Sequence, residues 1–339
     1  MTLEPMIPHG RKAAALAIVL LALGLVPPAS WAHPPDAPAA VEVVATFDAG
    51  HLETPESLVF DREGNVYISL ALTGEIRRIT PDGTQSTFAT IPIGAPLTPC
   101  GGFIAIMGGL TIDSHGNLYV TAAACDPVNR GVWKVAPDGE TRILAQLPLE
   151  ALPNGIALHH GTLYVPDSFL GRVWAVPVEG GPATVWFDDP ALLGPPPGSP
   201  FPGANGLKVF RNEMYVSNSG AGTIVVIPID GNDEPGTPRL HAQIPAPQGC
   251  DDFAFDVLGN LYCGSDPFRT LLRVAPDGSV DTLLTVADGL DGPTAAAFGV
   301  RDGKFDLYIT NGAFPFFSTT HQPSLMRLHL DVPGAPLNR

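Results

Sequence analysis

The segment "LPNGIALHHGTLYVPDS" at residues 152–168 is followed by a second segment of the same design, "GANGLKVFRNEMYVSNS" at residues 203–219. Each contains an Asn-Gly pair, then a short apolar stretch, a turn, and a second apolar stretch around a tyrosine. Short apolar stretches separated by turn residues are typical of antiparallel strands. The two segments therefore predict one structural unit that occurs more than once in the chain.

The tyrosine of this unit recurs along the whole chain. Successive copies lie 52, 45, 51, 47 and 46 residues apart, at Tyr67, Tyr119, Tyr164, Tyr215, Tyr262 and Tyr308. A repeat of this length, built of short strands with Gly, Asn and Pro-Asp-Gly turns, is typical of β-propellers. No helical periodicity competes with it after the N-terminal segment. We expect an all-β fold, a six-bladed β-propeller of four-stranded antiparallel blades, over residues 45–335.

Residues 1–32 have the pattern of a signal peptide. Basic residues ending at Lys12 precede the apolar run 13–26, which is too short to span a bilayer, and small residues follow up to Ala32. This pattern predicts cleavage after Ala32, a Pro/Ala-rich leader over 33–44, and a periplasmic or secreted protein. A retained N-terminal anchor is the alternative.

The chain is acidic. Removing residues 1–32 takes two basic and one acidic residue from the full counts of 18 and 34, which leaves 16 and 33 and a net charge of −17. Such a chain lacks the basic surface that nucleic acid or anionic lipid requires. No later segment is apolar for long enough to span a membrane. We expect a monomer that acts on a small molecule.

The four cysteines are compatible with an oxidising compartment. Cys100 and Cys125 flank one strand hairpin, so we expect a disulfide between them. Cys250 and Cys263 lie on neighbouring strands but out of register, so we expect them to be free and buried.

The first strand of each propeller blade lines the central channel, and its opening residue faces the channel mouth. Counting back from the tyrosines places six residues at this position, Glu56, Gly108, Asn154, Asn205, Asp251 and approximately Thr294. Carboxylate and carboxamide oxygens are the ligands that Ca²⁺ prefers, whereas Zn²⁺ prefers His or Cys. Each residue alone is explained as a turn or surface residue. Together they place carboxylates in a narrow channel, where a cation removes the cost of burying charge.

These residues resemble the senescence marker protein/gluconolactonase-like superfamily, which includes the paraoxonases and diisopropyl fluorophosphatase. The similarity covers residues 45–330 and rests on four ordered segments, "PESLVFD" (55–61), "LPNGIAL" (152–158), "GANGL" (203–207) and "GCDDFAFD" (249–256). It implies that Glu56, Asn154, Asn205 and Asp251 bind a catalytic or structural Ca²⁺, although another divalent cation is possible. Gluconolactonases usually have Asp in place of Asn205, so the paraoxonase pattern is closer.

The resemblance implies a calcium-dependent lactonase or esterase, in which Asp251 or Asp252 acts as general base. Paraoxonases have Asn in place of Asp252, and that residue also reaches the ion, so we expect a bulge at this pair. Connections rich in Pro, Gly and Phe, at 91–109, 186–204 and 312–317, favour an apolar or weakly polar substrate.

Two other functions fit a propeller. One is a non-catalytic binding platform in which Ca²⁺ only braces the channel. The other is carbon–carbon bond formation without metal, as in strictosidine-synthase-like proteins, and the four metal-type ligands argue against it. The histidines lie in predicted turns or strand edges, and no motif gives any of them a catalytic role.

Overall fold

The computed structural model of the protein describes residues 41–100, 103–194 and 201–336. The predicted signal peptide, and the leader as far as residue 40, lie outside these residues and stay predictions. Strand β1 (Val41–Thr46) begins inside the range assigned to the leader, so the last residues of that range already belong to a sheet.

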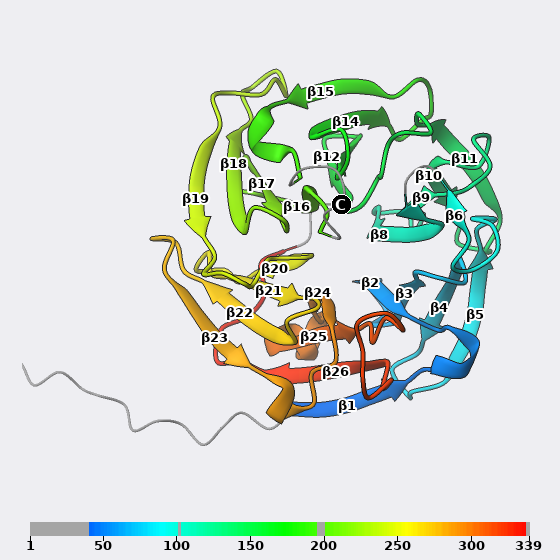
Figure 1. Ribbon diagram of the computed structural model, residues 1–339, viewed down its shortest axis with the longest axis vertical. Coiled ribbons are helices and arrows are strands. Elements are labelled where there is room, and N and C mark those ends of the chain that lie inside the picture. Colours follow the sequence, from blue (N-terminus) through cyan, green and yellow to red (C-terminus); the bar gives the residue numbers. More distant parts are fainter. Residues whose placement is uncertain (1–40, 101–102, 195–200, 337–339) are drawn as a thin grey trace, which may run out of the picture. The chain divides into compact units, whose positions relative to one another are not determined.

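Six sheets of four antiparallel strands surround a common centre (Figure 1). Blades 1 to 5 each use four consecutive strands, and the strands are numbered from the innermost outward. The innermost strands are β2 (Pro55–Phe60), β8 (Ile106–Ile112), β12 (Ala157–His159), β16 (Ala204–Phe210), β20 (Phe253–Phe255) and β24 (Pro293–Phe298). The second strands are β3 (Val66–Leu70), β9 (Leu118–Ala123), β13 (Thr162–Asp167), β17 (Glu213–Asn218), β21 (Leu261–Ser265) and β25 (Asp306–Asn311).

The outer half of each blade is regular as well. The third strands are β4 (Glu75–Ile79), β10 (Gly131–Val135), β14 (Arg172–Pro177), β18 (Thr223–Pro228), β22 (Thr270–Val274) and β26 (Ser324–His329). The outermost strands of blades 1 to 5 are β5 (Gln85–Thr90), β11 (Thr141–Gln146), β15 (Thr184–Asp188), β19 (Arg239–Gln243) and β23 (Val280–Leu284). The remaining described elements are β6 (Pro99–Cys100), β7 (Phe103–Ile104), and the 3-10 helices η1 (Ala49–His51), η2 (Pro190–Leu192), η3 (Val286–Asp288) and η4 (Arg301–Phe305).

Blade 6 takes its outermost strand from the other end of the chain. Strand β1 pairs with β26, from Val41 opposite Leu328 to Thr46 opposite Ser324. This pairing closes the ring of blades, because the first and last described strands share one sheet (Figure 1). The predicted fold class, an all-β six-bladed propeller, is confirmed.

The second strands are apolar on both faces because each lies between two neighbouring blades. In β9, Leu118 and Val120 belong to the buried cluster shared with blade 1, whereas Tyr119 belongs to the cluster shared with blade 3. Successive side chains of a strand point to opposite faces. A strand that is buried on both sides therefore reads as a continuous apolar run.

In three blades the repeat tyrosine is held by the turn that precedes it. The Tyr119 hydroxyl donates to Asp113 Oδ2 at 3.0 Å, and Asn117 Nδ2 donates to the same oxygen at 2.7 Å. The same arrangement recurs at Asp61, Asn65 and Tyr67 and at Asp256, Asn260 and Tyr262. Each of the three aspartates also accepts backbone N–H groups of its own turn.

Both cysteine pairs are bonded. Cys100 and Cys125 form the expected disulfide, with Cα atoms 5.1 Å apart. The expectation for the other pair was wrong, because Cys250 and Cys263 form a disulfide with a Cα separation of 5.7 Å. Strand register does not extend to Cys250, since β20 begins only at Phe253 and the backbone before it is irregular.

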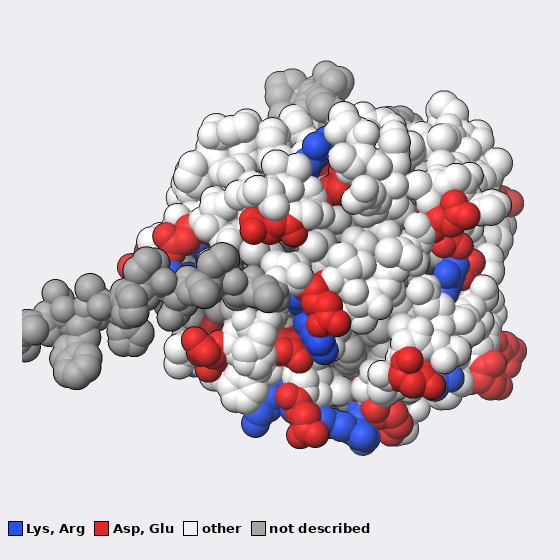
Figure 2. All heavy atoms as spheres, turned by 90° about the horizontal axis from the view of Figure 1, so that it is seen from below, with Lys and Arg blue, Asp and Glu red and all other residues white. Residues whose placement is uncertain are grey.

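The visible charges are mixed in sign. Figure 2 shows one side of the molecule, on which Lys and Arg side chains lie beside Asp and Glu rather than gathering into a basic patch. Among the described residues, no helix is long and apolar enough to cross a membrane.

Candidate functional site

Backbone hydrogen bonds join the predicted mouth positions of neighbouring blades. Gly109 N–H donates to Asn154 O at 2.8 Å, and Gly155 N–H donates to Asn205 O at 3.0 Å. Continuing round the channel, Gly206 N–H donates to Asp251 O at 3.2 Å. The structure therefore places the counted residues side by side around the channel.

The ring continues through the last blade to the first. Asp252 N–H donates to Thr294 O at 2.9 Å, and the Thr294 hydroxyl donates to Pro55 O at 3.1 Å. Glu56 follows Pro55 in β2 and is 6% exposed. Its place in this ring agrees with the count from the tyrosines.

The glycines of the two Asn-Gly pairs are required by the close approach of the innermost strands. A Cβ atom at Gly155 would lie 2.7 Å from Asn205 O, and one at Gly206 would lie 2.5 Å from Asp251 O. Such distances exclude any side chain. Asn-Gly is thus a packing motif at the channel here, although the same dipeptide is a common hairpin turn elsewhere.

Register breaks accompany these positions. Pairing of β2 with β3 is irregular between Pro55 and Ser57, and that of β16 with β17 between Ala204 and Leu207. In blade 5, Gly264 bonds to both members of the aspartate pair, accepting from Asp251 N–H and donating to Asp252 O. Such irregularities are common next to active sites, where they redirect a side chain. The backbone at the pair is therefore bulged, as the resemblance implied.

Two serines fix the orientation of the two asparagines. Asn154 Nδ2 donates to Ser168 Oγ at 3.3 Å, and Asn205 Nδ2 donates to Ser219 Oγ at 2.9 Å. The Ser219 hydroxyl in turn donates to Cys250 O at 2.6 Å. Because the amide nitrogens are engaged, the carboxamide oxygens are the atoms available to a ligand, and Asn205 Oδ1 is buried without a partner.

Carboxylates are concentrated at this mouth. Burial raises the pKa of Glu56 well above its usual range, and the charges of Asp266 and Asp252 raise it further. Burial likewise raises the pKa of Asp251, with further increases from Glu56, Asp266 and Asp252, against a smaller opposing effect of the Asn205 amide. Glu56 Oε2 and Asp266 Oδ1 are buried without a hydrogen-bond partner.

Unpaired buried oxygen atoms are costly, and a divalent cation is the group that would satisfy them. The donors present are carboxylate and carboxamide oxygens held by neighbouring backbone and hydroxyl groups. This set fits Ca²⁺. Glu56, Asn154, Asn205 and Asp251 are the residues that would hold it.

Asp266 is a site residue that the sequence interpretation missed. It lies four residues after Tyr262, and the corresponding residues after Tyr164 and Tyr215 are the asparagine-orienting Ser168 and Ser219. The repeat that located the channel-mouth positions therefore contained the signal for Asp266. Burial raises its pKa to about 7, with a further increase from Asp291 and an opposing effect of Arg269. A Cβ atom at Gly292 would lie 2.4 Å from Asp266 Oδ1, so this glycine leaves room for the carboxylate.

Asp252 has a different environment from Asp251. Lys208 Nζ lies 2.5 Å from Asp252 Oδ1, and the Phe253 N–H donates to the same oxygen at 2.9 Å. Lys208 also lines an apolar cavity of about 410 Å³ to which all six innermost strands contribute. The structure pairs Asp252 with this lysine, whereas the resemblance implied that it reaches the ion.

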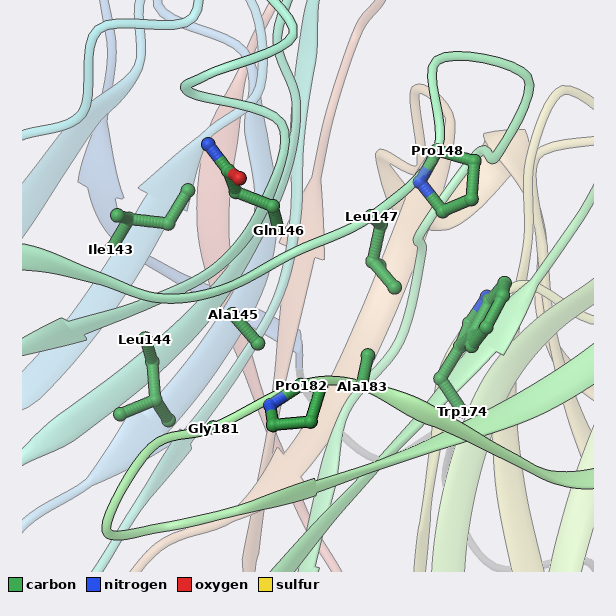
Figure 3. Close-up of a pocket in the computed structure, with 10 residues that line it drawn as sticks. All are labelled: Ile143, Leu144, Ala145, Gln146, Leu147, Pro148, Trp174, Gly181, Pro182 and Ala183. Carbon is green, nitrogen blue, oxygen red and sulfur yellow. The ribbon is translucent and has the colours of Figure 1, made fainter.

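Aromatic side chains come from several connections at the mouth side of the blades. Phe314 is buried against Ala71 and Leu72, with Ile104 and Phe317 packed on the same cluster. Two ring pairs join further connections, Phe103 with Phe169 and Phe201 with Phe268. By contrast, the groove between blades 2 and 3 in Figure 3 is lined by residues 143–148, Trp174 and residues 181–183, none of which is titratable. That groove offers no acid–base chemistry.

Comparison with known proteins gives the fold. No family model and no curated protein sequence matches the chain. Regucalcin from Agrobacterium tumefaciens, described as a calcium-binding protein, matches with a TM-score of 0.65 at 17% identity, over 89% of this chain and 98% of the other. A luciferin-regenerating enzyme matches with a TM-score of 0.66 at 14% identity, over 88% and 98%. A gluconolactonase from Xanthomonas campestris matches with a TM-score of 0.63 at 15% identity, over 88% and 90%.

These proteins are six-bladed propellers of the superfamily that the sequence resembles. Identities this low establish a shared architecture. The chemistry of this chain has to be argued from its own residues.

Proposed function

We propose that the protein is a metal-dependent hydrolase of lactones or other esters, with Ca²⁺ or another divalent cation held by Glu56, Asn154, Asn205 and Asp251. One observation carries the proposal. Glu56 Oε2 and Asn205 Oδ1 are buried, lack partners and lie on opposite sides of the ring of channel-mouth positions, in blades 1 and 4. The gluconolactonase structure supports the coarser statement, a lactonase-like propeller, and regucalcin, described as a calcium-binding protein, supports a metal site.

When bound, the cation polarises the carbonyl oxygen of the substrate and lowers the barrier to addition of water. Asp251 is assigned to holding the ion, beside the Asn205 carboxamide. Asp252 is less suited to act as general base than the sequence suggested, because Lys208 occupies its carboxylate.

Asp266 is the better candidate for the general base. Its Oδ1 is buried and unpaired, so the carboxylate is available to accept a proton, and in the metal-free protein burial raises its pKa to about 7. It would accept the proton of the attacking water and return it to the leaving oxygen of the substrate. We assign Asp252 to fixing Lys208 and the bulged backbone next to Asp251.

The residues around the mouth favour an acyl or aryl group over a sugar acid. Phe169 and Phe316 are 37% and 47% exposed, and both come from connections at the mouth side of the blades. Exposed aromatic side chains around a pocket provide contact area for an apolar ligand. We therefore propose aryl esters and lactones with an apolar substituent as the substrate class.

We also propose that the protein is exported after cleavage behind Ala32. The two disulfides support this, because such bonds persist in oxidising compartments. Intact-mass measurement of exported material should give a chain that begins near His33. A soluble chain that still begins at Met1 would contradict it.

A panel of aryl esters and lactones, assayed with Ca²⁺ and again after treatment with chelator, tests the enzymatic function. We expect turnover that chelator abolishes and Ca²⁺ restores. Asp266→Asn should lower kcat at least about 100-fold, in the range that a general base contributes, while Ca²⁺ still raises the melting temperature. A protein that Ca²⁺ stabilises but that hydrolyses no member of the panel would instead be a calcium-braced binding platform.

A further inference from the structure

We infer that the protein has a second metal site, formed by His159, His160 and Asp233 at the boundary of blades 3 and 4, and that it binds Zn²⁺ or a related transition metal. Among the described residues, these three form the one group of at least three His, Cys, Asp or Glu side chains whose ligand atoms all lie within 4.8 Å of one another. It is distinct from the channel mouth, since β12 leads away from Asn154 and ends at His159.

The hairpin between β12 and β13 brings the two imidazoles together. His159 pairs with Thr162, so His160 and Gly161 form a two-residue turn with φ values of 45° and 78°. Positive φ at both central residues is the conformation of a tight hairpin turn. Successive side chains of a strand would diverge, but here the two rings are stacked with centroids 3.8 Å apart.

Asp233 reaches this pair from another blade. It lies between β18 and β19 of blade 4, in a turn where its N–H donates to Asp230 O at 3.1 Å. Trp186 of blade 3 donates its Nε1–H to Asp233 O at 2.7 Å, which holds the aspartate against the hairpin. The backbone of Asp233 is therefore fixed by groups outside the proposed ligand set.

The distances suit a small divalent ion. Asp233 Oδ1 lies 2.9 Å from His160 Nδ1 and 3.6 Å from His159 Nε2. Zn²⁺ bonds nitrogen and oxygen at about 2.0–2.2 Å, so two ligands of a tetrahedral ion are about 3.3 Å apart, between these two values. Two nitrogens and one oxygen are a zinc-type donor set, unlike the all-oxygen set at the mouth.

Access to the site is open on one side. The His159 side chain is 7% exposed, whereas those of Asp233 and His160 are 38% and 64% exposed. A metal bound there would have one buried ligand and two at the surface, which leaves a coordination position for water. It would also cross-link blade 3 to blade 4 through His160 and Asp233, which are 73 positions apart in the sequence.

The experiment is a calorimetric titration with Zn²⁺ of the full chain, first treated with chelator and then saturated with Ca²⁺ so that the channel mouth is filled. We expect one equivalent to bind, and His160→Asn and Asp233→Asn each to lower the affinity at least about tenfold. Both replacements suit the positive φ of 45° and 62° at these positions, because Asn adopts that conformation readily. Far-ultraviolet circular dichroism checks that the variants remain folded.

Two controls separate this site from an exposed histidine elsewhere and from the channel mouth. His329→Asn removes a histidine that also lies 2.7 Å from a carboxylate, Asp306, and it should leave the Zn²⁺ isotherm unchanged. Glu56→Gln, at the channel mouth, should also leave it unchanged. The inference is overturned if the wild-type protein takes up no Zn²⁺ at micromolar concentration, or if folded His160→Asn and Asp233→Asn bind it as the wild-type protein does.

Discussion

Two sets of carboxylates in this protein differ in whether their oxygens are satisfied. The turn aspartates Asp61, Asp113 and Asp256 accept hydrogen bonds from backbone N–H groups, an asparagine and a tyrosine. At the channel mouth, Glu56 and Asp266 have buried oxygens without partners. Both sets consist of carboxylates, so residue type does not distinguish them. The presence of hydrogen-bond partners on the oxygens distinguishes a structural carboxylate from one that is available to a ligand.

The pKa of Asp113 in the turn set and those of Glu56 and Asp251 at the mouth are shifted in opposite directions. Burial tends to raise the pKa of Asp113, but hydrogen bonds from Asn117 and from its own turn outweigh it and lower the pKa. At the mouth, burial acts together with neighbouring carboxylates, and the pKa values of Glu56 and Asp251 rise. The comparison predicts opposite consequences when charge is removed from each set.

The largest expected effect is on the turn set. Asp256 is fully buried and accepts from Asn260 Nδ2 at 2.7 Å and from the Tyr262 hydroxyl at 3.0 Å, besides three backbone N–H groups. Asp256→Ala leaves these buried donors unpaired and should lower the free energy of unfolding by about 3–4 kcal/mol. Urea unfolding measures it, with the exposed turn residue Asp277 as the matched control. An equal response of Asp277→Ala would remove the distinction.

Removing charge at the mouth should do the reverse. Glu56→Gln relieves carboxylate repulsion, so the metal-free protein should gain about 1–2 kcal/mol. The wild-type protein should gain about 2.7 kcal/mol at a Ca²⁺ concentration 100 times the Kd, and the variant should lose most of this gain. Thermal unfolding with chelator and with Ca²⁺ measures both. A destabilised metal-free variant would mean that Glu56 is a structural residue.

The sequence could predict the channel-mouth positions because a repeat is a one-dimensional signal. Counting from six tyrosines located Asn154 and Asn205 without knowledge of any side-chain direction. Asp266 needed a second count, from the tyrosine to the end of the next strand, where two other blades carry serine. The pairing of Asp252 with Lys208 depends on a backbone bulge, and no spacing in the sequence specifies the direction of a bulged side chain.

The pH dependence of stability should distinguish the two sets through Asp266. Its pKa is 3.8 as the reference value and about 7 in the folded protein, so between these values the folded state binds more protons than the unfolded state. This contribution to stability is present below about pH 4 and is lost as the pH rises towards 7.

The test compares metal-free wild-type protein with Asp266→Asn across this range. The wild-type protein loses the contribution of Asp266 as the pH rises, and the variant has no such contribution to lose. The free energy of unfolding of the variant, relative to that of the wild-type protein, should therefore rise with pH by up to about 1 kcal/mol per pH unit. Parallel stability curves between pH 4 and 7 would show that Asp266 titrates normally. Carboxylates away from the mouth cancel in the difference, since both proteins contain them, whereas Glu56 and Asp251 lose the repulsion from Asp266 in the variant and add to the difference.

The smallest effect concerns a group that never contacts the ion. Ser219 Oγ accepts from Asn205 Nδ2 at 2.9 Å and donates to Cys250 O at 2.6 Å, so it sets the direction of Asn205 Oδ1. Ser219→Ala should lower the free energy of unfolding by about 1 kcal/mol, because the removed hydroxyl is small and one carbonyl loses its donor. Its effect on Ca²⁺ should be larger, about a tenfold weaker affinity, because a misdirected carboxamide no longer offers its oxygen. Calcium titration of Ser219→Ala beside Ser279→Ala, an exposed turn serine, measures the difference. If both variants bind Ca²⁺ as the wild-type protein does, the backbone alone holds Asn205, and Ser219 does not set the direction of Asn205 Oδ1.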